Sequence, residues 1–378
     1  LLRNRARYEL GSNTYAQGMI DTYADDVVGT GPRLQLRLPD AEANREIEAH
    51  FATWCRQVQL ADKLHTLVMA KVGDGEGFGL FINNPGVHHP VQLDWQLLEC
   101  DHFTARLGEA LDPWYVDGIR FDRYRNPISY DVLREHPGGG MATLQVGMSD
   151  SIAANLVIHF FRRRRPGQVR GVPEITPALP LYGQLRRYTL AVIAAAEAAA
   201  DHAGVIKAQV PPEEIQKTEP LEEIELYPRS FVTLPAGWDI HQMQAQQPTN
   251  TYPEFKAEIV GEIARCLSMP YNVAAGNSSS YNYSSGRLDF KNYAKRIRIE
   301  RHRLELQVLA RILMAWLDEA TLIPGLIPRG LPPFALWPHE WFWDGEEHID
   351  PQKEANAQGT RLTNLTTTLA EEYARKGQ

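Results

Sequence analysis

Residues 270–316 read PYNVAAGNSSSYNYSSGRLDFKNYAKRIRIERHRLELQVLARILMAW, and the rest of the chain is organised around them. The first part is rich in Asn, Ser and Gly, which favour turns and local side-chain-to-backbone hydrogen bonds, so we predict a loop without regular structure. The second part predicts a helix from Ser285 to Ala320, capped by Ser284 or Ser285 and about 50 Å long. Its apolar positions recur every three, four or seven residues and are Phe290, Tyr293, Ile297, Leu304, Val308, Ile312 and Trp316.

The predicted helix is strongly basic. Between Arg287 and Arg311 it carries eight Lys or Arg against three acidic residues. The simplest interpretation is a solvated surface helix after an ordinary loop, and the alternative is a moving polar contact mounted on a stiff helix. The basic residues are Arg287, Lys291, Lys295, Arg296, Arg298, Arg301, Arg303 and Arg311.

Length and composition set broad limits. The 378 residues are enough for two or three domains, and 43% hydrophobic residues can form sizeable cores. A net charge of −8 argues against a protein that coats DNA along its whole surface. Cys55, Cys100 and Cys266 lie far apart, without metal-ligand or disulfide spacing, which suits a reducing compartment. No apolar run reaches transmembrane length. The first residue is not Met and the last segment stops within a helical pattern, so we expect both ends to be trimmed.

Residues 13–161 combine short helices with strands. Asn13, Asp40 and Asp62 are each placed to cap a helix, and Gly29 is placed to end the first one. The region from Val91 onward predicts a mostly antiparallel β unit. Its strands are expected at residues 91–98, 118–124, 128–133, 144–146 and 156–161, after earlier strands at 34–38 and 79–82.

Three local patterns contain residue types that can bind ligands. The GDGEGFG run at 73–79 lacks a following Lys-Ser/Thr and misplaces the third glycine of GxGxxG, which argues against nucleotide binding. The four arginines at 162–165 favour a solvated turn or a contact with an acidic partner, although they could also touch phosphates. Histidines 88, 89, 136 and 159 show no metal motif, so we interpret them as surface or core residues.

Two more helices bracket a small acidic insert. The first is expected at residues 177–203 and contains AAAEAAA at 194–200, which is either an ordinary exposed helix end or a run of small side chains that allows close packing against another copy. The insert at 205–247 combines six glutamates with short strands at 205–210, 230–234 and 238–243. The returning helix is expected at 253–268, and a later helix begins after Asp350.

Five segments, in this order and spacing, resemble the lambda-type portal proteins of tailed bacteriophages. They are residues 13–31 ending in DVVGTG, the pair Gly75 and Glu76, residues 159–173 with RRRRPGQVRGVP, residues 282–287 (NYSSGR) and residues 349–355 (IDPQKEA). The resemblance spans nearly the whole chain. It departs from the family in a short acidic insert and a tail that ends early.

The resemblance implies an α+β portal fold with long stem helices, a mostly antiparallel β wing, a small β clip and a helical crown. The wing would be residues 1–173, the stem helices 174–203 and 251–268, and the clip 204–250. A tunnel loop would follow at 269–284, then a long wing or crown helix at 285–320 and a C-terminal wing or crown segment at 321–378.

The same resemblance implies a non-enzymatic ring of about twelve copies at one capsid vertex, with its stem contact at residues 194–200. Such a ring packages, retains and ejects double-stranded DNA. Its other partners would be terminase, the major capsid protein and head-completion or tail proteins, without a membrane. It would act in the virion and, during assembly, in the host cytoplasm. No cofactor, metal or catalytic residue is expected.

The channel residues follow from the tunnel-loop assignment. They would be Asn277, Ser278, Ser279, Ser280, Tyr281 and Asn282. No Lys or Arg lies between Pro270 and Gly286, so contacts with sliding DNA would be short-lived, because each neutralised phosphate adds attraction. The following helix would offer weak phosphate contacts or contacts between subunits through Arg287, Lys291, Lys295 and Arg298.

Two other functions compete with this interpretation. One is a metal-dependent nucleic-acid-processing enzyme, although the acidic residues form no paired-carboxylate motif and no HExxH, Walker or CxxC signature is present. The other is a generic oligomeric scaffold without a role in DNA handling.

Overall fold

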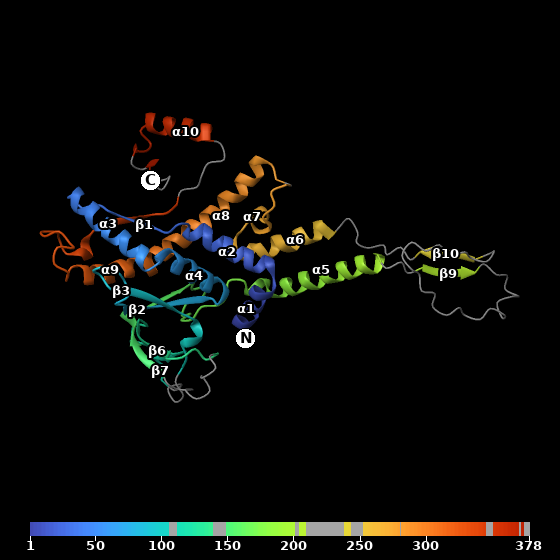
Figure 1. Cartoon of the computed structure of the whole chain (residues 1–378), viewed down its shortest axis with the longest axis horizontal. Coiled ribbons are helices and arrows are strands. Elements are labelled where there is room, and N and C mark those ends of the chain that lie inside the picture. Colours follow the sequence, from blue (N-terminus) through green and yellow to red (C-terminus); the bar gives the residue numbers. More distant parts are fainter. Residues whose placement is uncertain are drawn as a thin grey trace. The chain divides into compact units, whose positions relative to one another are not determined.

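The computed structural model describes residues 1–105, 112–138, 149–200, 204–208, 238–242, 252–279, 281–344, 351–369 and 372–373. The chain divides into two compact units (Figure 1). The larger unit comprises Leu1–Leu179 and Ala264–Gln378, and the smaller one comprises Pro180–Ile263.

The larger unit begins with four helices. They are α1 (Leu2–Ser12), α2 (Thr14–Val28), α3 (Ala41–Gln57) and α4 (Leu60–Gly73). The side chains of Asn13 and Asp40 each accept two backbone N–H groups at the start of α2 and α3, which confirms both predicted caps. The third predicted cap is wrong, because α4 starts at Leu60 and Asp62 therefore lies inside its first turn.

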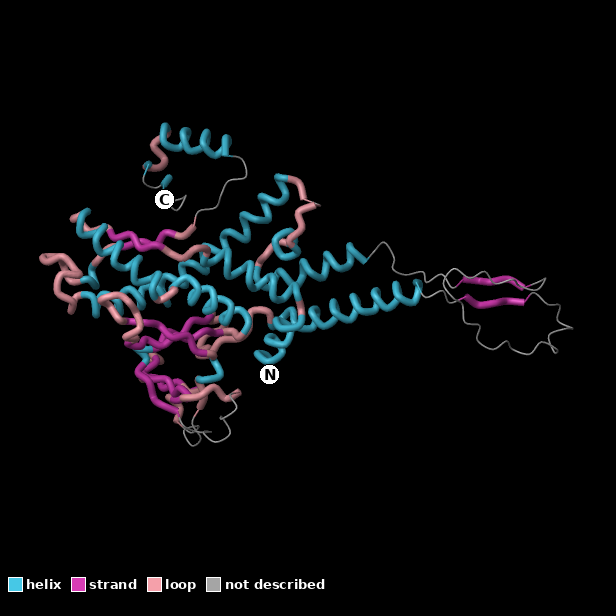
Figure 2. Tube along the Cα trace, in the orientation of Figure 1, coloured by secondary structure: helices cyan, strands magenta, loops and turns pink. Residues whose placement is uncertain are grey.

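Antiparallel strands form the β part of this unit (Figure 2). A three-stranded sheet has β2 (Glu76–Asn83) between β3 (Leu93–Leu98) and β8 (Val157–Phe161). A four-stranded sheet follows the order β4 (Tyr115–Val116), β5 (Ile119–Phe121), β6 (Pro127–Leu133) and β7 (Ser149–Ala153). The antiparallel prediction is confirmed. The strands β4 and β7 were not predicted, and the strand expected at 144–146 lies outside the described residues.

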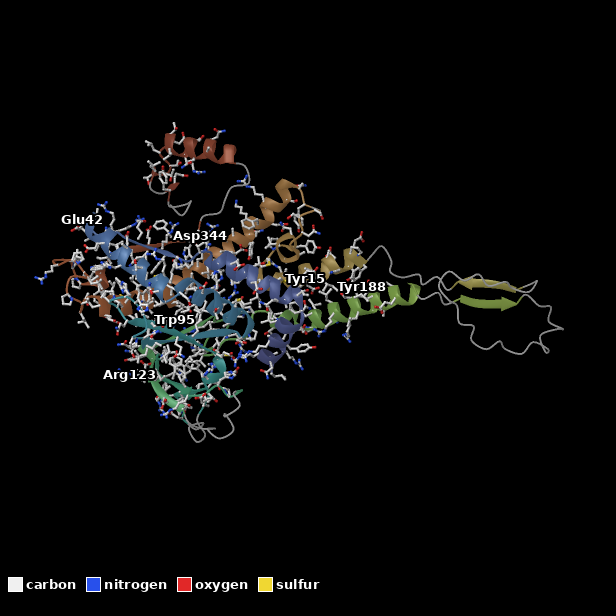
Figure 3. All side chains as sticks on the ribbon, in the orientation of Figure 1. Tyr15, Glu42, Trp95, Arg123, Tyr188 and Asp344 are labelled. Carbon is white, nitrogen blue, oxygen red and sulfur yellow. The ribbon has the colours of Figure 1, made fainter. Side chains whose placement is uncertain are left out.

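A further pair of strands joins distant parts of the sequence. The strand β1 (Arg33–Leu36) pairs antiparallel with β11 (His339–Phe342), with Leu34 opposite Trp341. Leu34 and Leu36 are buried, as their alternation predicted. Asp344, labelled in Figure 3, extends this link by accepting a hydrogen bond from the Thr30 hydroxyl at 2.7 Å. The chain after the long helix is thereby fixed to the start of the protein.

Aromatic side chains fill the core of the larger unit. The ring of Phe51 on α3 meets that of Trp316 edge-on at 5.3 Å between centroids. Trp95, also labelled in Figure 3, is fully buried against Gly79. A Cβ added at Gly79 would lie 1.5 Å from the indole nitrogen of Trp95, so only glycine fits opposite this ring. The packing of Trp95 from β3 over Gly79 of β2 therefore fixes how these two strands lie against each other.

The stretch at 270–320 is more structured than predicted. A short helix, α7 (Tyr271–Ala275), occupies part of the expected loop. The long helix begins as α8 (Tyr283–Leu304), passes through a π turn at Glu305–Leu309 and continues as α9 (Ala310–Ala320). Its cap is Asn282, whose side chain accepts the backbone N–H of Ser285, so the predicted Ser284 or Ser285 cap is wrong. All the predicted apolar positions are buried except Phe290, which is exposed.

The smaller unit contains a pair of helices and a pair of strands. The helices are α5 (Leu179–Ala200) and α6 (Tyr252–Ala264), and the strands β9 (Gly204–Ala208) and β10 (Trp238–Gln242) pair antiparallel. The two helices run side by side in Figure 1, and the Tyr252 hydroxyl donates to the Thr189 hydroxyl at 3.2 Å. The strand expected at 230–234 lies outside the described residues.

Shorter elements complete the described chain. The 3₁₀ turns η1 (Cys100–His102), η3 (Ala154–Leu156), η4 (Thr176–Ala178), η6 (Arg265–Leu267) and η8 (Phe334–Leu336) connect larger elements, and α10 spans Pro351–Thr363. Asp350, the predicted cap of α10, lies outside the described residues. Across the described part of the chain, no helix has both the length and the apolar character that a bilayer crossing requires.

Candidate functional site

The polar loop predicted to face a channel joins α7 to α8. Gly276 ends α7 with a φ of 60°, a left-handed conformation that glycine adopts readily. Asn277 then accepts the backbone N–H of Ser279 at 3.0 Å, and the N–H of Tyr281 donates to the Ser278 carbonyl at 3.1 Å. These bonds fold the loop back on itself as a turn.

The loop presents polar side chains to solvent. Asn277, Ser278, Ser279 and Asn282 are exposed, and Tyr281 is half-buried. Ser280, also predicted to face the channel, lies outside the described residues. Because Asn282 caps α8, the last residue of the loop is tied to the first turn of a 22-residue helix. The loop is therefore a short, uncharged tip on a rigid element.

The structure divides the eight basic residues of the long helix into two groups. Arg287, Lys291, Lys295 and Arg298, the predicted contact residues, are all exposed. They follow each other at intervals of four, four and three residues and therefore lie along one side of α8.

The other four bind groups of the same chain. Arg296 pairs with Glu174 at 2.7 Å, and Arg303 pairs with Glu300 at 3.0 Å. Arg301 donates to the carbonyls of Asp26 and Val27, each at 2.9 Å. Arg311 donates to the carbonyls of Ala154, Asn155 and Val157. Arg296, Arg301 and Arg311 therefore hold the long helix against the rest of the unit, whereas Arg303 pairs within α8 itself.

A buried charge cluster anchors α8 to α4 and to the segment before η4. Lys71 lies with its Nζ 2.6 Å from Glu174 Oε1 and also pairs with Glu300. The side chains of Lys71, Glu174 and Glu300 are at most 1% exposed. Burial alone would raise the pKa of Glu174, but Lys71 and Arg296 outweigh burial and lower it to about 2. The Glu174 carboxylate therefore remains ionised at neutral pH.

A second buried carboxylate, Glu76 on β2, joins four segments. It accepts hydrogen bonds from Arg3 at 2.8 Å, His159 at 3.0 Å, Arg170 at 2.7 Å and the backbone N–H of Gly171 at 2.8 Å. Burial would raise the pKa of Glu76, but the bonds from His159 and Arg170 lower it to about 2. The charge of Glu76 thus fixes α1, β8 and the 170–171 segment around β2.

Gly75, the residue before Glu76, allows the backbone to adopt the conformation that places Glu76 in this site. Gly75 has a φ of 95°, and a Cβ there would lie 2.4 Å from the carbonyl carbon of Val172. Asp74, one residue earlier, binds Arg7 of α1 at 2.6 Å. Within the GDGEGFG run, Gly75 therefore lets the backbone pass close to the backbone of residues 171–173.

The arginine run at 162–165 lies close to the first cluster. Arg162 and Arg164 lie 3.8 Å and 3.9 Å from Glu174, and the guanidinium of Arg163 lies over the ring of Phe161. The carboxylate near this run belongs to its own chain, and the predicted contact with an acidic partner stays a prediction. A phosphate contact stays a prediction.

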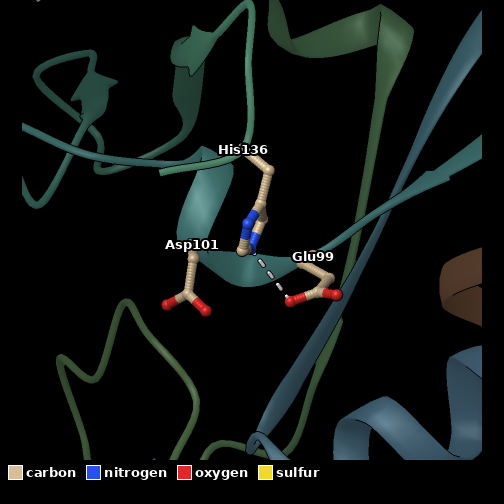
Figure 4. Close-up of side chains that lie close together, drawn as sticks. All are labelled: Glu99, Asp101 and His136. Atoms are coloured by element: carbon tan, nitrogen blue, oxygen red, sulfur yellow. Dashed lines mark hydrogen bonds and ion pairs between the residues drawn. The ribbon is translucent and has the colours of Figure 1, made fainter. Parts of the chain in front are cut away.

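One group of side chains has metal-ligand types in proximity. The donor atoms of Glu99, Asp101 and His136 lie within 4.8 Å of one another, and His136 Nε2 contacts Glu99 Oε2 at 3.1 Å (Figure 4). However, Arg7 pairs with both carboxylates and Arg3 also pairs with Asp101. A cation entering this group would meet two guanidinium groups, so we do not assign a metal site here.

Comparison with known proteins identifies the family. The profile described as phage portal protein, lambda family, matches residues 1–301. The chain belongs to this family. A probable portal protein of Halomonas phage phiHAP-1 is 24% identical to this portal chain over 417 residues, which cover 100% of the chain and 77% of the phage protein.

Solved structures share the fold of the portal chain. A chain from the neck of an empty GTA particle computed with C6 symmetry has a TM-score of 0.51 and 17% identity, covering 83% of this chain and 80% of that one. A chain from the virion of a native gene transfer agent (GTA) particle has a TM-score of 0.50 and 15% identity, covering 100% and 93%. The neck of a native GTA particle computed with C12 symmetry gives a TM-score of 0.50 and 15% identity, covering 94% and 87%.

The motifs that suggested the portal family have identifiable structural roles. Gly75 and Glu76 form the backbone crossing and its buried carboxylate, and Arg170 from the RRRRPGQVRGVP segment binds Glu76. Asn282 from NYSSGR caps α8. Sequence reasoning did not identify Lys71, Glu174 and Glu300 as partners, because single charged residues, whether on a helix or in a turn, are usually exposed to solvent. Only the short distances between them in the folded structure identify these three residues as one charge cluster.

Proposed function

We propose that this portal chain forms the ring-shaped channel at one capsid vertex through which double-stranded DNA is packaged, retained and ejected. The observation that carries the proposal is the match of residues 1–301 to the lambda portal family. In the ring, the exposed tip at 277–282 faces the channel. The buried cluster of Lys71, Glu174 and Glu300 keeps the base of α8 in place while DNA passes.

The chemistry of the tip suits passage of DNA better than tight binding. Each phosphate neutralised by a Lys or Arg adds a salt-dependent attraction, and several such contacts would hold the duplex. The tip supplies amide and hydroxyl groups without a cationic side chain. The contacts are therefore weak and short-lived, and the nearest exposed cation of the long helix is Arg287.

We also propose the organisation of the ring. The C6 and C12 symmetries of the similar neck structures support a closed assembly, here of about twelve copies joined head to tail. Residues 1–173 form the wing, 174–203 and 251–268 the stem helices with a contact at 194–200, and 204–250 the clip. Residues 269–284 form the tunnel loop, 285–320 the long wing or crown helix, and 321–378 the C-terminal wing or crown segment.

The partners and location follow from this role. The ring docks terminase during packaging and later head-completion or tail proteins, and it contacts the major capsid protein. It resides at the portal vertex of the virion after assembly in the host cytoplasm. The chain itself carries out no catalysis and needs no cofactor.

Deletion of Asn277–Tyr281 tests the channel assignment. The deleted chain should form rings of normal size in negative-stain images, while the yield of DNA-filled particles falls. Packaging and retention at the wild-type level would show that the tip does not face the channel. A compact monomer with magnesium-dependent cleavage of DNA would instead support an enzyme.

A charge substitution sharpens this test. Ser278→Lys adds a cation to the exposed tip of every subunit and should slow translocation more at low salt than at high salt. Ser278→Gln is the matched control, because it adds a side chain of similar length without the charge. Equal rates for the two variants at low salt would contradict the weak-contact account.

A further inference from the structure

The exposed side of α8 carries a row of positive charge. Arg287, Lys291 and Lys295 are four residues apart, which places neighbouring side chains about 6 Å from each other along the helix, and Arg298 extends the row. Like charges at this spacing destabilise an isolated helix. A partner of opposite charge would remove this repulsion. Leu288 and Ile299 border the row and are 66% and 42% exposed.

The exposed side of α6 carries a matching row of negative charge. Glu254, Glu258 and Glu262 are also four residues apart and are all exposed. Within the described ranges of the chain, none of the three forms a salt bridge with another residue. Phe255 lies beside this row and is 49% exposed. Both rows thus combine a charge repeat of about 6 Å with a bordering apolar side chain.

We propose that the basic row of α8 in one copy packs against the acidic row of α6 in the next copy around the ring. This contact rests on the proposed portal function and specifies which surfaces close the ring. A head-to-tail ring needs two different complementary patches on every subunit, and the two rows satisfy this requirement. Their equal spacing allows successive pairs to form together, and an exposed apolar side chain of α8, Leu288 or Ile299, can pack against Phe255 in the same contact.

Complementary charge reversals test the contact. The first variant is Lys291→Glu with Lys295→Glu, and the second is Glu258→Lys with Glu262→Lys. Each alone should lose rings in native mass spectrometry, because both rows then carry the same sign. A mixture of the two variants should recover rings with alternating subunits, since every contact again joins opposite charges. Recovery also shows that both variants fold.

The remaining outcomes overturn the contact. Normal rings from either variant alone would show that the rows are not paired. Recovery only when all four substitutions are placed in one chain would assign the pairing to a single subunit. Rings of the first variant that assemble normally but bind a short DNA duplex more weakly would make the α8 row a DNA contact. A wild-type chain that forms no ring overturns the proposed function, and this contact with it.

A variant that removes positive charge from the α8 row gives a second test, which does not require mixing two variants. Raising the NaCl concentration from about 0.1 M to about 1 M should release subunits from wild-type rings, because salt screens exposed charges. Rings of the Lys291→Gln, Lys295→Gln variant should be weaker at low salt and less sensitive to this change. An unchanged salt response in that variant would contradict the pairing.

Discussion

Lys71 and Glu174 form an ion pair that is closed to solvent, with Nζ and Oε1 2.6 Å apart and side chains 0% and 1% exposed. The pair joins α4 to the segment that leads into η4, and Glu300 brings α8 into the same cluster. Removal of one member of a buried ion cluster weakens the compensation of the charges that stay buried, which costs more than a surface pair contributes. Without Lys71, Glu174 would keep Arg296 and Glu300 would keep Arg303 as cationic partners.

Lys71→Met should lower the free energy of unfolding by about 3 kcal/mol, because Glu174 and Glu300 stay buried and keep only arginine partners, Arg296 and Arg303. Chemical denaturation of the purified chain measures this. Lys63→Met is the matched control: Lys63 also lies on α4 and pairs with Asp94, but both side chains are partly exposed, so the loss should be about 1 kcal/mol or less. Equal losses would argue against the buried cluster as an anchor.

Acid should weaken the fold through Glu76 and Glu174. Both have a folded-state pKa of about 2 against an ordinary value of 4.5, so each stabilises the fold fully above pH 4.5. This stabilisation is lost as the pH falls from 4.5 to about 2, and it amounts to about 3 kcal/mol per group at pH 7. Urea unfolding between pH 2 and pH 7 should show the decline. Glu76→Gln should flatten the profile, and addition of Glu174→Gln should flatten it further; a profile as steep as wild type would contradict the assignment.

Gly75→Ala should destabilise the chain by about 1–3 kcal/mol or more, because alanine disfavours a φ of 95° and its Cβ would overlap the backbone of Val172. Thermal unfolding of the variant measures the effect. The control is Gly18→Ala on α2, where a Cβ meets nothing within 4 Å and an exposed helical position should gain up to about 1 kcal/mol. Destabilisation of both variants by the same amount would exclude the backbone crossing as the cause.

Asn282→Ala should fray the first turn of α8 at a cost of about 1 kcal/mol, because the Ser285 N–H loses its acceptor. Hydrogen exchange should accelerate at the Ser285 and Gly286 amides and remain unchanged near Leu304. Asn282→Asp keeps an acceptor oxygen and should retain the protection. The same protection in the alanine variant would mean that the cap does not fix the tip to the helix.

Local sequence signals predicted much of the fold. The caps at Asn13 and Asp40 depend on the side chain and the next three residues, so they could be recognised directly. At the start of α8, three residues in the run Asn282 to Ser285 can cap a helix, and sequence alone did not select Asn282. The start of α4 was mispredicted for the same reason: Asp62 is a residue type that caps helices well, and the local sequence did not show that the helix begins earlier, at Leu60.

Contacts between distant residues could not be predicted. The strands β1 and β11 are separated by about 300 residues of sequence, and nothing local to either indicates the other. Arg3, Glu76 and Arg170 each look like surface residues until the fold brings them together. For the candidate site, composition indicated an uncharged tip and a basic helix. It did not show that half of the basic residues bind their own chain.

The π turn at Glu305–Leu309 affects the whole length of the long helix. A π turn holds one residue more than an α turn, and each residue of a helix corresponds to a rotation of about 100°. The side chains of α9, including Trp316, are therefore rotated about the helix axis relative to the directions they would have if α8 continued as a regular α-helix. Deletion of one residue within this turn would convert it to a regular α-helical turn and rotate Trp316 away from Phe51. Substitution of an exposed residue such as Leu306 would leave the contact between Trp316 and Phe51 in place. The length of this segment, more than the identity of its exposed side chains, therefore sets where Trp316 lies.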